Sequence, residues 1–83
     1  MKVKKPTTKI AAENFLRQTL DGVDVTSFEP TYYPGFLGVR FRYKGNLYRF
    51  TPLNMLVEKC ENGMLVCDED ACKIGDILEK ALV

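Results

Sequence analysis

The segment from Phe36 to Phe50, FLGVRFRYKGNLYRF, constrains the fold more than any other part of the chain. Side chains of a β-strand point alternately to the two faces of a sheet. A two-residue turn at Lys44-Gly45 or at Gly45-Asn46 would pair two strands here, and both turns divide the side chains in the same way. One face then carries the apolar side chains Leu37, Val39, Phe41, Tyr43, Tyr48 and Phe50. The opposite face carries Phe36, Arg40, Arg42, Leu47 and Arg49, and we expect it to display Lys44 as well. We therefore predict a hairpin with a buried aromatic face and an exposed basic face.

The size of the chain is that of one small globular domain. Its 83 residues are 46% hydrophobic and 28% charged, a composition typical of folded proteins. We expect a single domain over residues 1–83, in which residues 1–6 form a flexible basic arm. A domain of this size buries only about 60 to 65% of its unfolded surface, so we expect a shallow site and no deep active-site cavity.

Capping and turn residues divide the rest of the chain into short elements. Thr7 or Thr8 can begin a helix that ends before Gly22, because glycine suits the position after a last helical turn. An acidic triplet at residues 68–70 favours the start of another helix, since negative charge complements the positive end of the helix dipole. In order, we predict a helix over residues 7–20, a strand over 23–28, a loop over 29–35, the hairpin over 36–50, a helix over 52–62, a short strand over 64–67, and a helix from 68 almost to 83.

The segment after the hairpin has two interpretations. Thr51 can cap a helix that has Pro52 at its first position. The apolar residues that follow have the helical spacing i, i+3, i+4 and i+7, namely Leu53, Leu56, Val57 and Cys60. The pair Asn62-Gly63 could instead form the turn of a second hairpin. We favour the helix because of its 3.6-residue period.

These elements predict a small two-layer α+β domain in the order α-β-β-β-α-β-α. Its antiparallel sheet has helices packed on one face, so the other face stays open. The first five elements resemble the order found in double-stranded RNA-binding domains. Those domains have a lysine-rich segment at the start of the helix after the third strand, whereas residues 51–56 contain no lysine. We therefore transfer no residue role from that family.

The open face is the best candidate for a binding surface. Guanidinium groups bind carboxylates and phosphates, and apolar groups between them add buried area at an interface. Two tyrosines in the loop before the hairpin would add aromatic contact area. The candidate partner-binding residues are Tyr32, Tyr33, Phe36, Arg40, Arg42, Lys44 and Arg49. The alternative is a solvated sheet face, because charged side chains are common on exposed strands.

The charge distribution favours a protein as the partner. Residues 1–50 carry nine Lys or Arg against four Asp or Glu, and residues 51–83 carry three against seven, which gives a net charge of +1. A nucleic-acid-binding domain is usually basic as a whole, and the pI here is about 7.7. We therefore predict a non-catalytic binding or regulatory module that docks an acidic protein partner. The alternative is a nucleic-acid-binding protein that uses the same arginines with the terminal lysines Lys2, Lys4, Lys5 and Lys9.

The chain lacks the sequence motifs of common catalytic and metal sites. It has no histidine, and its cysteines, Cys60, Cys67 and Cys72, form no CxxC pair. We expect no catalytic residues, no metal ion and no cofactor. The absence of a secretion signal and the odd number of cysteines favour reduced thiols in the cytoplasm. No apolar run is long enough for a membrane-spanning helix, so we expect no membrane partner.

Overall fold

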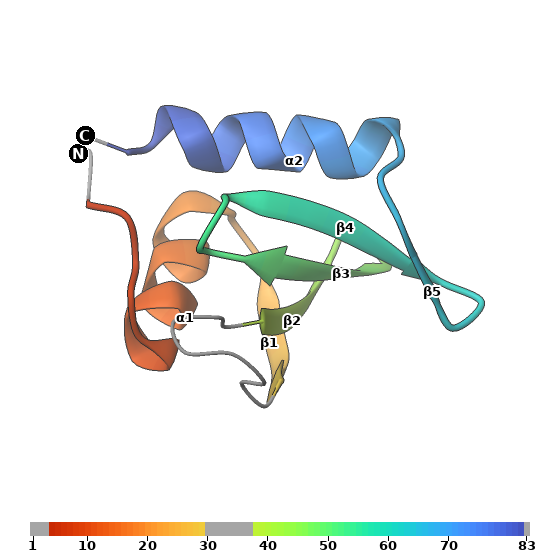
Figure 1. Cartoon of the computed structure of the whole chain (residues 1–83), viewed down its shortest axis with the longest axis horizontal. Coiled ribbons are helices and arrows are strands. Elements are labelled where there is room, and N and C mark those ends of the chain that lie inside the picture. The colour runs from red at the N-terminus through yellow and green to blue at the C-terminus, as the bar shows by residue number, and fades with distance from the viewer. Residues whose placement is uncertain (1–3, 30–37, 83) are drawn as a thin grey trace.

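Within the described residues, five strands form one antiparallel sheet in which each strand pairs with the next along the chain (Figure 1). The computed structural model describes residues 4–29 and 38–82. The strands are β1 Asp24–Glu29, β2 Gly38–Tyr43, β3 Asn46–Thr51, β4 Leu56–Glu61 and β5 Met64–Val66, and the helices are α1 Lys9–Thr19 and α2 Glu69–Lys80. The predicted fold class, a small α+β domain built on an antiparallel sheet, is confirmed.

The predicted hairpin is present as β2 and β3, with Lys44 and Gly45 as its two-residue turn. Tyr43 lies opposite Asn46 in the register, and the two turn residues have φ angles of 51° and 84°. Positive φ at both positions is typical of the tight turn whose twist matches that of the flanking strands. The predicted division of side chains into two faces follows from this register.

The predicted helix over residues 52–62 is wrong, because the chain forms β4 there. A turn over residues 52–55 ends with Met55 at a φ of 55°, and the strand begins at Leu56. Residues 62 and 63 both have positive φ and form the second hairpin turn, between β4 and β5. In this arrangement β4 forms ladder hydrogen bonds with a strand on each side. Pairing with β3 and β5 favours a strand here, although the spacing of the four apolar residues also fits a helix.

Both helices cover the same face of the sheet. The ring centroids of Phe15 on α1 and Phe50 on β3 lie 6.1 Å apart, and Gly75 on α2 lies next to Val57 on β4. The buried core joins the two layers: Ala12, Phe15, Leu16, Leu20, Val39, Phe41, Tyr48, Phe50, Val57, Ala71, Ile74 and Leu78. Figure 1 shows α2 lying along β4, while α1 lies nearer β1 and β2. The opposite sheet face therefore has no helix over it within the described residues.

Each helix begins at a side-chain cap. The Thr8 hydroxyl accepts a hydrogen bond from the Ala11 amide at 3.1 Å, as predicted for the start of the first helix. The Asp68 carboxylate accepts one from the Ala71 amide at 2.9 Å and begins α2. In the described parts of the chain, neither helix has both the length and the apolar character needed to cross a membrane.

Candidate functional site

The three predicted arginines lie together on the side of β2, β3 and β4 that neither α1 nor α2 covers. Arg40 lies directly opposite Arg49 in the register, and Arg42 lies opposite Leu47. We call this surface the arginine face and define it by its residues Arg40, Arg42, Leu47, Arg49, Leu56 and Glu58. Arg42 is exposed, and the other five side chains are half-buried. The hairpin register alone is enough to place these arginines side by side.

Carboxylates flank the arginines on both neighbouring strands. Glu58 on β4 lies opposite Arg49, and Asp24 on β1 lies opposite Arg42. The guanidinium Nη1 of Arg40 lies 3.8 Å from the Cys60 sulfur of β4, and Nε of Arg49 is buried. Like charges placed directly opposite each other in a sheet are unfavourable, and neighbouring opposite charges reduce that cost. The arginine face is therefore a mixed surface with an excess of positive charge.

The other predicted binding residues do not join this surface within the described residues. Lys44 lies at the hairpin turn, where its Nζ is 5.3 Å from the centre of the Tyr43 ring. It therefore lines the helix side of the sheet and not the arginine face. Three further candidates, Tyr32, Tyr33 and Phe36, lie outside the described residues.

The described N-terminal lysines lie beside α1. Lys4 and Lys5 line a hollow of about 290 Å³ together with residues of this helix, Asn14 among them. Lys5 Nζ donates a hydrogen bond to the Leu53 carbonyl, and Pro6 is buried. This part of the terminal segment therefore contacts the domain and adds no charge to the arginine face. The flexibility predicted for residues 1–6 stays a prediction.

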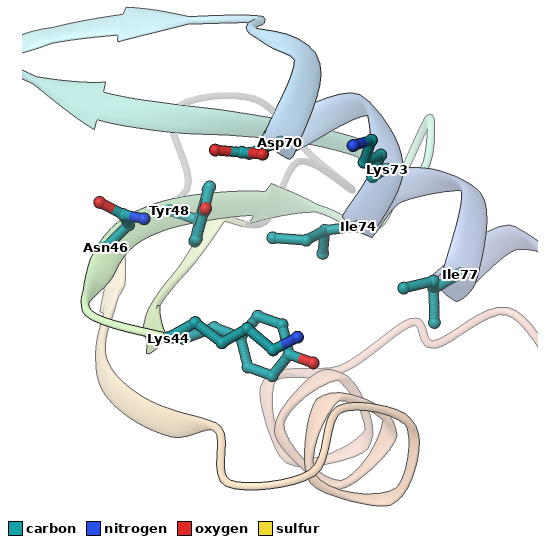
Figure 2. Close-up of a pocket in the computed structure, with 8 residues that line it drawn as sticks. Lys44, Asn46, Tyr48, Asp70, Lys73, Ile74 and Ile77 are labelled. Atoms are coloured by element: carbon teal, nitrogen blue, oxygen red, sulfur yellow. The ribbon is translucent and has the colours of Figure 1, made fainter.

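A second hollow, which the sequence did not predict, lies between the hairpin and α2 (Figure 2). Its volume is about 250 Å³, and its lining residues are Tyr43, Lys44, Asn46, Tyr48, Asp70, Lys73, Ile74 and Ile77. Figure 2 shows Ile74 extending from α2 towards Tyr48. Burial raises the pKa of the Tyr48 phenol above its ordinary value, so this group stays neutral. Alternation identified the tyrosines as inward-facing, but no sequence signal indicated that α2 would lie across them.

The described cysteines are free and form no metal cluster. The Cys67 and Cys72 sulfurs lie 3.5 Å apart, while Cys60 contacts Arg40. Nowhere in residues 4–29 and 38–82 do three or more His, Cys, Asp or Glu side chains gather into a group able to hold a metal ion.

Asp68 at the start of α2 interacts with a backbone amide of the helix and with Lys59 of β4. The hydrogen bond from the Ala71 amide lowers the pKa of the Asp68 carboxyl, and Lys59 lowers it further from a distance of 3.4 Å. The hydrogen bond with Asp68 in turn raises the pKa of Lys59. This pair links β4 to the first turn of α2.

Asp68 should contribute stability that is lost in acid. Because its pKa in the folded protein is below the unfolded value of 3.8, the contribution is complete above 3.8 and disappears as the pH falls through the folded value. Asp68→Asn keeps an oxygen that can cap the helix but cannot titrate, so its melting temperature should fall less steeply in acid. Asp68→Ala should melt at a lower temperature even at neutral pH. Thermal melts of the three proteins across the acid range would test this, and parallel pH profiles for wild type and Asp68→Asn would contradict it.

No known protein family, curated protein or solved structure was found to match this chain.

Proposed function

We propose that this protein is a non-catalytic binding module that docks an acidic protein partner through its arginine face. The observation that supports this most directly is the cross-strand pair of Arg40 and Arg49, with Arg42 beside them, on a sheet face that neither helix covers. Planar guanidinium groups held side by side on rigid strands can bind carboxylates in a fixed orientation. A cytoplasmic location with reduced thiols belongs to the same proposal.

The composition of the arginine face favours a protein over a nucleic acid. Glu58 and Asp24 flank the arginines and would repel the continuous charge of a phosphate backbone more than the separate carboxylates of a protein, which can contact the arginines between them. The half-buried Leu47 and Leu56 can add apolar contact area, and interfaces between proteins combine apolar and charged groups in this way. Nucleic acid, the alternative ligand, would have to avoid both carboxylates.

The positions of the acidic residues of α2 are also compatible with an acidic partner on the arginine face. The first turn of α2 carries Glu69 and Asp70, and this helix packs on the face of the sheet opposite the arginines. The negative charge of the C-terminal half is therefore placed largely in the helix layer. An acidic partner can approach the arginine face without meeting α2.

Replacing Arg40, Arg42 and Arg49 together with alanine should abolish partner binding and leave the fold intact. Truncating one interface arginine commonly costs about 1 to 2 kcal/mol, so the triple variant should lose about 3 kcal/mol or more and bind at least about 100-fold more weakly. Affinity capture from the native host, with and without nuclease, would identify the partner, and titration of the purified partner would give the affinities. Circular dichroism would show that the variant is folded.

The matched control is alanine at Lys2, Lys4 and Lys5, which removes the same formal charge from a different part of the molecule. This variant should bind a protein partner almost as well as the wild type. Capture that disappears after nuclease treatment, with both triple variants weakened and a flatter salt dependence, would identify the ligand as nucleic acid. Unchanged binding by the folded arginine variant would show that the arginine face is only solvated surface.

A further inference from the structure

Two exposed cysteines meet where β5 is followed by α2. Cys67 is the residue before the helix cap Asp68, and Cys72 is the fourth residue of α2. Their sulfur atoms are 3.5 Å apart. A disulfide has about 2.0 Å between its sulfurs, so the two atoms must come about 1.5 Å closer to form the bond.

Helix geometry explains why these side chains are neighbours. The residue before an N-cap and the fourth residue after the cap often pack together as a hydrophobic staple, which sets the direction in which the chain enters the helix. Cys67 and Cys72 occupy these two positions relative to Asp68. In most proteins such a pair is apolar and unreactive, whereas here both members are thiols. The capping geometry that begins α2 thus also holds two thiols in contact.

We propose that Cys67 and Cys72 are a reversible modification site that forms an intramolecular disulfide by exchange with a low-molecular-weight disulfide such as oxidised glutathione. One thiolate attacks the small disulfide, forms a mixed disulfide with one of its sulfurs and releases the other as a thiol. The second protein thiolate then attacks the protein sulfur of the mixed disulfide and releases the second small thiol. The protein loses two hydrogens and is oxidised, while the small disulfide is reduced to two thiols.

The surroundings of the pair slow its reaction with a small disulfide. The hydrogen bond shared with Cys67 raises the pKa of the Cys72 thiol, and the nearby Asp76 and Asp68 raise it further. Because the thiolate is the attacking species, the pair reacts more slowly than cysteines with lowered pKa values. Its advantage is proximity, since the second attack takes place within the molecule. Cys60 lacks this advantage because its sulfur contacts the Arg40 guanidinium and not another thiol.

Redox titration of single-cysteine replacements would test the assignment. Cys60→Ser keeps the proposed pair, while Cys67→Ser and Cys72→Ser each remove one member and keep the same number of thiols. Each reduced protein would be equilibrated with reduced and oxidised glutathione, quenched with an alkylating agent, and weighed by mass spectrometry. Formation of an internal disulfide releases two molecules of reduced glutathione. At a constant concentration of oxidised glutathione, a tenfold increase in reduced glutathione should therefore lower the ratio of internal disulfide to dithiol by about 100-fold. A mixed disulfide should respond by only about tenfold.

Cys60→Ser and the wild type should show the 100-fold response and lose two alkylatable thiols. Cys67→Ser and Cys72→Ser should show only glutathione adducts with the tenfold response. The same titration in denaturant should give less internal disulfide, because the unfolded chain no longer holds the sulfurs in contact. A tenfold response in Cys60→Ser would overturn the proposal, and so would an internal disulfide that forms equally well in either of the other variants or in the unfolded chain.

Discussion

Replacing Phe41 with alanine should lower the free energy of unfolding by about 3 to 5 kcal/mol. The Phe41 side chain is 0% exposed, and its ring stacks against that of Tyr48 with 5.5 Å between centroids. The substitution removes the transfer free energy of the ring and leaves a cavity that a close-packed core fills only in part. A domain of this size has a total stability of only about 5 to 10 kcal/mol, so this loss is a large part of it. Urea denaturation followed by circular dichroism would measure the change.

The matched control is Arg42→Ala, one position along the same strand. Arg42 points to the opposite face and is exposed, so its truncation should change the free energy of unfolding by no more than about 0.5 kcal/mol. The comparison tests the division of the hairpin into a buried and an uncovered face. Equal losses in the two variants, or a larger loss for Arg42→Ala, would mean that this division is wrong.

Leu78→Ala should be the second strongly destabilising substitution, with an expected loss of about 2 to 5 kcal/mol. Leu78 lies on α2 and is 0% exposed, within the cluster that joins both helices to the sheet. Removing its side chain weakens the attachment of α2 to the rest of the domain. The unfolding free energy would again be measured by urea denaturation, and amide hydrogen exchange would show whether α2 opens separately from the sheet.

The neighbouring Ile77 provides the control for this helix. Its side chain is 44% exposed and lines the hollow next to the hairpin, so Ile77→Ala should cost about 1 kcal/mol or less. Both substitutions replace a branched aliphatic residue in α2 with alanine and alter helix propensity only slightly. A loss for Ile77→Ala as large as that for Leu78→Ala would show that α2 packs on the sheet through a different side.

The strongest sequence predictions rested on local signals that agreed with one another. Around Gly45, strand alternation and turn chemistry favoured the same hairpin, and the register opposite Asn46 confirms it. The caps of both helices also depend on residues within three positions along the chain, Thr8 with Ala11 and Asp68 with Ala71. Local interactions of this kind are present in the sequence itself, so they could be predicted without a tertiary structure.

The segment around β4 shows where local reasoning failed. Leu56, Val57 and Cys60 have a helical spacing, but only Val57 among them is buried, as alternation in a strand requires. The deciding interactions are the hydrogen-bond ladders that β4 forms with β3 and β5. These ladders pair β4 with residues outside the segment whose spacing predicted the helix. A pattern of four apolar residues fits either a helix or a strand when the neighbouring strands are unknown.

The sequence by itself determined the α+β class, the hairpin, and the grouping of Arg40, Arg42 and Arg49 on one face, because strand alternation and a two-residue turn are local properties. Only the tertiary structure decided which residues came to lie near them. In the folded chain, β4 brings Glu58 beside Arg49, and Lys44 lies on the helix side of the sheet. The helix α2 lies next to the inward-facing Tyr43 and Tyr48. These arrangements depend on contacts between segments far apart in the chain, and such contacts form where burial and pairing of the whole domain are most favourable.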